Sequence, residues 1–241
     1  MLTVKELSSK EIIFLRHSTT ENNEYLRNHS PVAWGGNEEF FTDPGLRDTC
    51  LSEKGHQLVN DLNRRLRSGK QPLDKASIDL VAVSPLRRTL QTATIGLNKV
   101  LIDTPCDPKM LVCPLARERL YMEADMGHPR SVLEKEFPNF DYSELPSDDS
   151  AWWYEPSALE PGEEWRPPGQ YLCAGEPRLE FGQRMIRLKN WLAEREEQRI
   201  MLVAHWGTIH SLTGKEFANC EIGVVKFNQL LSDEEILKVK V

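Results

Sequence analysis

The sequence has no apolar run that approaches the ~20 residues needed to span a bilayer, which argues against a membrane protein. Its first residues, MLTVKELSSKEIIFLR, include acids and no long apolar stretch, so they do not resemble a secretory signal peptide. Over the 241 residues, hydrophobic residues make up 39% and charged residues 28%. This composition is typical of a globular chain with a buried core, and it excludes collagen-like, coiled-coil and disordered proteins.

The chain has few cysteines, and they form no motif. The five are widely spaced and contain no CxxC pair: Cys50, Cys106, Cys113, Cys173 and Cys220. An odd number of cysteines at such spacing predicts reduced thiols in a cytoplasmic protein rather than a disulfide framework or a zinc site.

Positive charge is not in excess either, because 30 Lys and Arg residues stand against 37 Asp and Glu residues, a net charge of -7. Proteins that bind nucleic acids are usually basic, so we expect no nucleic-acid partner. An acidic chain can still bind a small anion if it gathers a few arginines in one pocket.

Short apolar runs alternate with amphipathic stretches along the chain. Buried strands are predicted at residues 11–16, 78–83 and 200–204, and weaker strands near 222–227 and 236–241. Helices are predicted at residues 52–67, 176–198 and 208–217, and another is predicted to start with Ser84 as its cap and Pro85 as its first residue. Strands separated by helices predict an α/β fold, a three-layer sandwich whose mostly parallel central sheet has helices on both faces.

We expect one domain over residues 1–241, because no internal repeat or second domain is evident. Residues 141–177 are an exception to the alternating pattern, since this stretch combines six prolines with three tryptophans. It is too rich in proline for core elements and too aromatic for a bare linker. We therefore expect an excursion packed over one edge of the sheet rather than a disordered hinge.

Polar and cationic residues follow each of the three clearest strands at its carboxyl end. These residues are Arg16-His17, the segment Ser84 to Arg88, and His205. The carboxyl ends of parallel strands share one edge of a sheet, where ligands of α/β proteins bind, so we expect these groups to meet there. No carboxylates are interleaved with these cations, so unpaired positive charge would favour a bound anion. Free N–H groups at the start of the helix after Ser84 would add to this preference, and a phosphate-sized dianion fits both features.

Five segments carry a resemblance to a known family, and they occur in that family's order across nearly the whole chain. The first is a strand ending in Arg16-His17, where the family has Arg-His-Gly, with Asn23 six residues after the histidine. The second and third are residues 51–57, LSEKGHQ, and residues 84–93, SPLRRTLQTA. The fourth, Glu118-Arg119-Leu120-Tyr121, is similar to a Glu-Arg-x-Tyr segment, and the last is a strand followed by His205-Trp206-Gly207. On these segments the chain resembles the histidine phosphatase superfamily, which includes the cofactor-dependent phosphoglycerate mutases.

The resemblance implies a covalent phosphoenzyme on His17, whose neutral imidazole would attack phosphorus. It implies that Arg16, Arg88 and His205 bind the phosphate oxygens and stabilise charge during the transfer. Asn23 would donate a further hydrogen bond to phosphate or substrate. These are expectations taken from the family's motifs, carried over position by position.

Glu118 is the acid that the resemblance implies: it would protonate the leaving oxygen and then activate water. Glu123 lies nearby, and a carboxylate in so charged a stretch also fits a solvated surface group. No metal and no other cofactor is implied, and the sequence offers no carboxylate cluster that would hold a metal.

Three positions leave alternatives open. Arg87 and Arg88 are adjacent, so helical spacing alone does not say which faces the pocket, although the family register favours Arg88. Asn22 is similarly adjacent to Asn23. Ser18 stands where the family has glycine, which puts turnover in doubt if that glycine is needed for a positive φ. If glycine serves only for close backbone approach, a small hydroxyl fits and even touches the phosphate.

The function expected from these observations is a metal-independent phosphatase acting on phosphomonoesters through phosphohistidine. Two alternatives stand beside it: a phosphoglycerate mutase, and a catalytically weak phospho-ligand binder that kept the pocket. The substrate is expected to be a small phosphomonoester or a phosphoprotein. The sequence determines neither the physiological substrate nor the oligomeric state.

Overall fold

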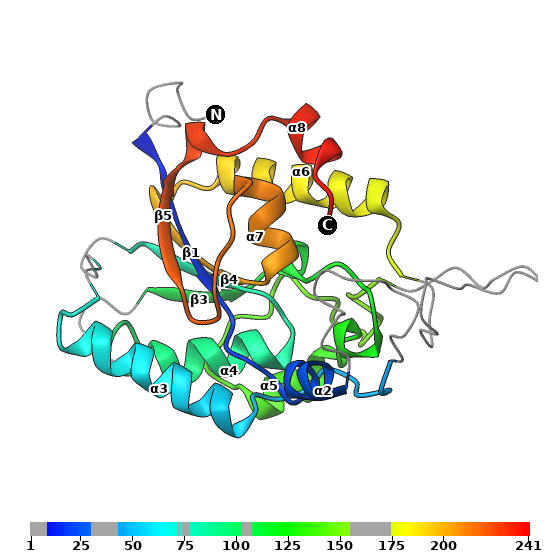
Figure 1. Ribbon diagram of the computed structural model, residues 1–241. Coiled ribbons are helices and arrows are strands. Elements are labelled where there is room, and N and C mark those ends of the chain that lie inside the picture. Colours follow the sequence, from blue (N-terminus) through cyan, green and yellow to red (C-terminus); the bar gives the residue numbers. More distant parts are fainter. Residues whose placement is uncertain (1–8, 30–42, 72, 74–77, 103–107, 155–174) are drawn as a thin grey trace, which may run out of the picture.

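A five-stranded sheet forms the centre of the protein, whose computed structural model describes residues 9–29, 43–71, 73, 78–102, 108–154 and 175–241 (Figure 1). The strand order is β3-β2-β4-β1-β5. The strands are β1 (Glu11–Arg16), β2 (Leu80–Val83), β3 (Lys109–Val112), β4 (Arg199–Ala204) and β5 (Ile222–Lys226). All neighbouring pairs are parallel except β1 with β5, which is antiparallel.

Helices cover both faces of the sheet, as Figure 1 shows. The helices are α2 (Glu21–His29), α3 (Glu53–Arg67), α4 (Arg87–Gly96), α5 (Arg130–Glu136), α6 (Arg178–Glu194), α7 (Trp206–Thr213) and α8 (Asp233–Lys238). Along β1, Ile13 and Leu15 pack in the cluster that includes α3 and α4, whereas Ile12 and Phe14 pack in the cluster that includes α6, α7 and α8. This two-residue alternation, with apolar residues on both faces, is typical of a sheet buried between two helical layers. The predicted three-layer α/β fold is confirmed.

The predicted elements agree closely where the apolar pattern is strong. The strand expected at residues 11–16 is β1, and the helix expected at 52–67 is α3, with Ser52 as its N-cap accepting a hydrogen bond from the backbone N–H of Gly55. Short elements were not predicted at all: α2, β3 and α5. Helices α2 and α5 have few apolar positions and β3 has only four residues, so their places depend on the tertiary contacts they make.

Two predicted elements are wrong. Residues 236–241 form no strand, because Ser232 and Glu235 make a capping box that starts α8 at Asp233. Helix α4 does not start at Ser84-Pro85 but at Arg87, with Leu86 as an N-cap that has no side-chain hydrogen bond. Ser84 instead turns its hydroxyl toward His205, as described below.

The first part of the proline- and tryptophan-rich segment packs against the protein. Tyr142 and Trp152 are buried in the cluster that also contains α3 and α4. The indole N–H of Trp152 donates to the carbonyl of His128, and Asp141 forms an isolated bridge with Leu111. The rest of the segment, residues 155–174, lies outside the described residues.

None of the helices among the described residues combines the length and the apolar character required to pass through a bilayer.

A close backbone approach fixes the loop that follows β1. A Cβ at Gly55 would lie 2.0 Å from the carbonyl oxygen of Thr19, so only glycine lets α3 approach this loop. In addition, Ser18 donates its hydroxyl hydrogen bond to the carbonyl of Gly55 at 2.7 Å. The start of α3 therefore holds the residues directly after His17.

Replacing Gly55 by alanine is expected to lower the free energy of unfolding by about 1–3 kcal/mol, because backbone must move to make room for the methyl group. Urea unfolding measures this change. Gly96→Ala is the matched control, since its Cβ would meet side-chain methyl groups and no backbone, Val59 at 3.2 Å and Leu62 at 3.4 Å. Equal stability of the two variants would contradict the expectation.

Candidate functional site

Strand pairing brings two histidines and a serine to the same edge of the sheet. In the parallel pairs, Arg16 lies opposite Ala204, and Val83 opposite Val203. The ladder continues for one residue, because the N–H groups of His17 and Ser84 donate to the carbonyls of Ala204 and Val203, each at 3.0 Å. The rings of His17 and His205 lie with centroids 5.0 Å apart.

His17 is buried, and its ring orientation is fixed by its own loop. Its Nδ1 lies 2.6 Å from the carbonyl oxygen of Ser18, which can only accept, so Nδ1 carries the proton. Burial and the positive charges of Arg88 and Arg16 lower the pKa of His17 well below its usual value of 6.5. The imidazole is therefore neutral, and its Nε2 lone pair is available as a nucleophile.

His205 has the opposite tautomer. Arg88 donates from Nε to Nδ1 of His205 at 3.2 Å, so the proton of His205 is on Nε2, which lies 2.7 Å from the hydroxyl of Ser84. Burial and the positive charge of Arg88 lower the pKa of His205 well below 6.5. The two histidines are thus a pair of neutral rings, one with a free acceptor nitrogen and one with an N–H donor.

The two adjacent arginines of α4 point in different directions. Arg88 is buried against His205, whereas Arg87 binds the Glu136 carboxylate and lies 2.6 Å from Nε2 of His128. The structure therefore brings Arg88 into the histidine cluster and leaves Arg87 outside it.

The expectation that no carboxylate lies among these cations is wrong. Arg88 donates from Nη2 to Asp125 at 2.8 Å and from Nη1 to the carbonyl of Ala124, and Asp125 is itself buried. Asp125 ends a short 3₁₀ helix, Glu123–Asp125, which is distant from Arg88 in the sequence and was not singled out. Because this carboxylate comes from another part of the chain, motif spacing gave no sign of it.

Arg16 lies beside the cluster at the end of β1. Its Nη1 donates to the carbonyl of Phe217 at 2.5 Å, and burial lowers its pKa while the carboxylate of Glu118 raises it. Its Nε is buried and has no hydrogen-bond partner among the described residues. An unpaired buried N–H costs about 1–3 kcal/mol, so this atom favours a bound acceptor.

Glu118 is partly buried next to α7. Its Oε2 accepts from the backbone N–H of Gly207 at 3.0 Å, and its Oε1 accepts from the N–H of Arg119 at 2.9 Å. A Cβ at position 207 would lie 2.5 Å from Oε1, so glycine is required there for the carboxylate to approach. Burial and the nearby Asp125 carboxylate raise the pKa of Glu118, which favours a protonated acid.

Asn23 sits in the first turn of α2, with its side-chain oxygen turned back to Thr20, the residue before the helix. That oxygen accepts from the backbone N–H of Thr20 at 3.1 Å and from its hydroxyl at 3.0 Å. The neighbouring Asn22 donates to the sulfur of Met122. Asn23 thus keeps its amide N–H groups as the donors that the predicted role needs, and that role stays a prediction.

Ser18 fits its position without backbone strain, because the residues with positive φ among those described do not include it. Its N–H donates to Thr92 at 3.0 Å, and its hydroxyl donates to Gly55. The hydroxyl therefore points toward α3, and the serine imposes no left-handed conformation on the loop.

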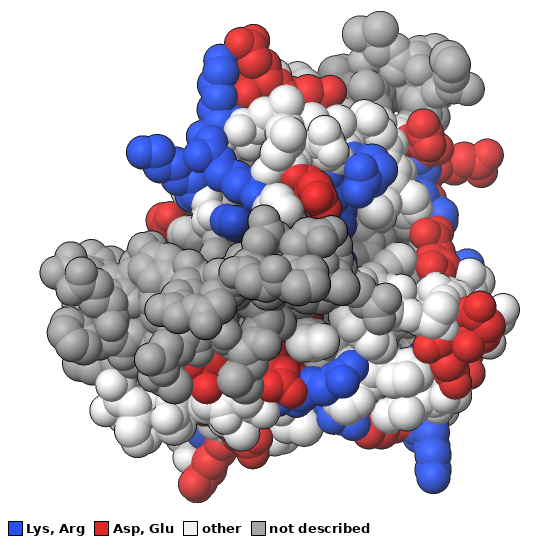
Figure 2. All heavy atoms as spheres, turned by 90° about the vertical axis from the view of Figure 1, so that its right-hand side faces the viewer, with Lys and Arg blue, Asp and Glu red and all other residues white. Residues whose placement is uncertain are grey.

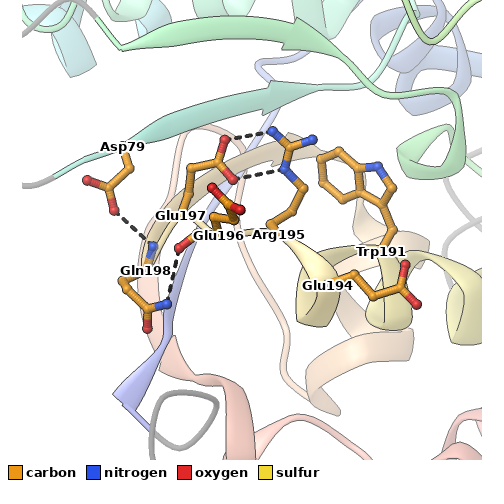
Figure 3. A pocket seen from close by; sticks show the side chains of 7 residues that line it. All are labelled: Asp79, Trp191, Glu194, Arg195, Glu196, Glu197 and Gln198. Atoms are coloured by element: carbon orange, nitrogen blue, oxygen red, sulfur yellow. Dashed lines mark hydrogen bonds and ion pairs between the residues drawn. The ribbon is translucent and has the colours of Figure 1, made fainter. Parts of the chain in front are cut away.

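No group of three or more His, Cys, Asp or Glu residues that would hold a metal ion occurs in the described ranges. A hollow lined by Trp191, Arg195 and acidic residues, drawn in Figure 3, lies at the amino ends of β2 and β4. Its residues Asp79 and Gln198 directly precede β2 and β4, whereas the histidine cluster follows the carboxyl ends of strands. The hollow therefore shares no residue with the cluster.

The surface on the side of the molecule that Figure 2 presents carries basic and acidic side chains close to one another in its described part. Such a mixed surface does not favour a long polyanion, whose binding relies on an extended basic face. The cations of the cluster are instead confined to the partly buried Arg16 and the buried Arg88.

Comparison with known proteins identifies the family. A family model described as the histidine phosphatase superfamily (branch 1) matches residues 12–220, a range that includes every residue of the cluster. The chain belongs to this superfamily.

Relatives of this superfamily member carry phosphatase or mutase-like names. A phosphoglycerate mutase-like protein of Arabidopsis thaliana is 27% identical over 235 residues, which cover 88% of this chain and 76% of the plant protein. A probable phosphatase of Schizosaccharomyces pombe is 28% identical over 138 residues, 56% of this chain and 52% of that protein. The solved ecdysone phosphate phosphatase of Bombyx mori, in complex with tungstate, is 16% identical with a TM-score of 0.52 and 92% coverage of each chain. That last likeness concerns the fold alone, and the names together support a phosphatase-type enzyme.

The neutral state of His17 in this superfamily member predicts how acid affects its stability. The unfolded chain takes up a proton on His17 near pH 6.5 while the folded protein does not, so the stability due to this residue is complete above that pH. It is lost as the pH falls from 6.5 toward the folded pKa. Wild type should therefore lose about 1.4 kcal/mol per pH unit more than His17→Gln over this window. Urea unfolding at about pH 7.5, 6 and 5 measures both proteins, and parallel curves would contradict a depressed pKa.

Proposed function

We propose that this protein is a metal-independent phosphomonoester hydrolase that acts through a phosphohistidine on His17. The observation that carries the proposal is the neutral, buried His17, with its Nε2 lone pair free, beside His205 and two arginines. A neutral imidazole between cations combines a nucleophile with a site for a dianion.

In the first step, Nε2 of His17 would attack phosphorus as the bond to the leaving oxygen breaks. Arg16, Arg88 and His205 would bind the non-bridging oxygens and stabilise their charge, and the Nε2–H of His205 would exchange its hydrogen bond to Ser84 for one to phosphate. This preorganised positive charge supplies the stabilisation that a metal would otherwise give. Asn23 would add an amide donor to the phosphate or the substrate.

Glu118 would act as the acid and then as the base. Its carboxyl would give a proton to the leaving oxygen, and the resulting carboxylate would take a proton from water as the water attacks the phosphohistidine. Phosphate then leaves, and His17 and Glu118 return to their starting states. The raised pKa of Glu118 supports the protonated form that the first step requires.

Hydrolysis is favoured over mutase chemistry by the contacts of Arg119, the basic residue of the Glu-Arg-x-Tyr segment. Its guanidinium donates to the carbonyls of Glu176 and Val241 and to the hydroxyl of Tyr121. A mutase needs a group that holds the substrate carboxylate, and Arg119 is already engaged within the protein. This engagement supports a hydrolase.

The proposed substrate is a small phosphomonoester or a phosphoprotein, since a terminal phosphoryl group is all that the cluster recognises. The described cysteines, Cys50, Cys113 and Cys220, are free thiols. They agree with the reducing cytoplasm, where we propose that the protein acts.

Brief incubation with a ³²P-labelled phosphodonor tests the phosphoenzyme. Wild type is expected to release phosphate from 4-nitrophenyl phosphate in EDTA and to form an acid-labile phosphoprotein. His17→Ala should lose both, with turnover at least about 10⁴-fold lower. Glu118→Gln should keep the label but hydrolyse it more slowly, by about 10²-fold or more.

The alternatives give different results. A mutase would interconvert phosphoglycerates much faster than it hydrolyses them. A binder would hold phosphate or vanadate and form no phosphoprotein, and either result would overturn the proposal.

Two neighbouring arginines provide a matched pair for the phosphate site. Arg88→Ala is expected to lower kcat/KM by about 10²–10³-fold, because it removes the buried cation beside His205 that would bind the phosphate. Arg87→Ala should change it by less than about threefold, because Arg87 faces Glu136. Steady-state kinetics, with circular dichroism to verify folding, measures both variants, and equal effects would contradict the assignment.

A further inference from the structure

A buried ion cluster lies directly behind Glu118. Its centre is Glu176, which is 2% exposed, and its two arginines are Arg117 at 7% and Arg184 at 3%. Arg117 donates to Glu176 from both Nη atoms at 2.7 and 2.8 Å, and Arg184 donates from Nε and Nη2 at 3.0 and 2.8 Å. One carboxylate thus accepts four charge-assisted hydrogen bonds from two guanidinium groups.

The arginines of this cluster also bind the main chain on which Glu118 is carried. Arg184 donates from Nη1 to the carbonyls of Leu115 and Arg117, at 2.8 and 2.7 Å, and from Nη2 to the carbonyl of Glu118 at 3.2 Å. Arg117 itself donates to the same Glu118 carbonyl at 3.3 Å. Helix α6, which carries Arg184, is therefore bonded to three carbonyls in four consecutive residues.

The position of this main chain decides where the Glu118 carboxylate lies. The carboxylate accepts one hydrogen bond from its own segment, at Arg119, and one from α7, at Gly207. The segment also touches α7 through Thr208, whose hydroxyl donates to the carbonyl of Arg117 at 3.0 Å. A shift of residues 115–118 would move the carboxylate away from Gly207, and so away from the end of β4 that bears His205.

The cluster carries a net positive charge, and both of its arginines bind the main-chain carbonyl of Glu118. Two guanidinium groups share the one carboxylate of Glu176, and Glu118 follows Arg117 in the chain. Burial lowers the pKa of Arg184 to about 10, and the carboxylates of Glu176 and Glu118 both oppose this lowering. Arg184 and Glu118 therefore interact electrostatically as well as through the main chain.

We propose that Glu176, Arg117 and Arg184 are positioning residues that hold the proton-transferring carboxyl of Glu118 at its working place and set its charge. This inference rests on the proposed function, because it assigns a task to residues behind the proposed acid. The cluster hydrogen-bonds to the main chain of Glu118 and, in the part of the chain that the structure describes, to none of the proposed phosphate ligands, so its loss should affect proton transfer to the leaving group more than attack by His17.

Two substrates of similar size separate these steps. 4-Nitrophenyl phosphate has a leaving group that departs with little help from an acid, whereas 2-phenylethyl phosphate depends on protonation. Glu176→Gln is expected to lower kcat for the alkyl phosphate about 10-fold or more relative to the aryl phosphate. It also leaves two arginines without their carboxylate, so the pKa of Glu118 falls. The loss of alkyl phosphatase activity with rising pH should then occur at a lower pH than in wild type.

Conservative and control variants accompany this substitution. Glu176→Asp keeps the negative charge between the two arginines. It is expected to show the wild-type pH profile, with a kcat for the alkyl phosphate between those of Glu176→Gln and wild type. Arg184→Lys keeps an ion pair but cannot reach the three carbonyls, so it should show the same selective loss for the alkyl phosphate. Glu197→Gln is the matched control, because Glu197 accepts two hydrogen bonds from Arg195 at the far end of α6. Glu197→Gln should leave kcat for both substrates unchanged.

The outcomes separate the two proposals. If wild type releases no phosphate from the aryl ester, the proposed function itself fails. The second case is that wild type is active and Glu118→Gln loses more kcat on the alkyl phosphate than on the aryl phosphate. If Glu176→Gln then lowers kcat equally for both substrates and leaves the pH profile unchanged, the positioning role alone is overturned. Unfolding of Glu176→Gln, Glu176→Asp and Arg184→Lys, under conditions where Glu197→Gln stays folded, would also overturn it, because the cluster would then serve stability only.

Discussion

The parallel pairing of β4 with both β1 and β2 is the constraint on which the candidate site depends. The hydrogen bonds of the sheet extend one residue past the strands, to His17 and Ser84. This pairing places His17, Ser84 and His205 next to one another at the carboxyl ends of β1, β2 and β4. A slip of one residue would turn each side chain to the other face of the sheet. The side chains on the two faces of β1 and β4 pack in separate clusters under different helices, so a slip would exchange their close-packed partners and disrupt both layers.

Charge is distributed around this edge so that the histidines stay neutral and the arginines stay charged. Arg88 is held by Asp125, and the pair behind Glu118 is held by Glu176. Buried ions are costly to desolvate, so arrangements of this kind depend on complete hydrogen bonding. The buried Nε of Arg16 has no hydrogen-bond partner among the described residues, and this favours a bound acceptor.

The sequence predicted the long elements well and the short ones poorly. Strand β1 and helix α3 have strong apolar patterns, and their cores are buried as those patterns require. At the end of the chain the apolar residues after Ile236 predicted a strand, but the capping box of Ser232 and Glu235 starts a helix there instead. A local hydrogen bond thus outweighed a weak hydrophobic pattern, which is usual near element boundaries.

The sequence by itself determined β1, β2 and β4, the two histidines that follow β1 and β4, and the family motifs, because strongly apolar strands and their end residues are properties of local chain order. Only the tertiary structure decided which of Arg87 and Arg88 joins the histidines, and that Asp125 and Glu176 supply the missing negative charge. Arg88 and Asp125 are 37 residues apart in the sequence, and Glu176 and Arg184 are 8 residues apart. Pairing between buried ions depends on distance and desolvation in the folded protein, and neither quantity is written in the spacing of the residues along the chain.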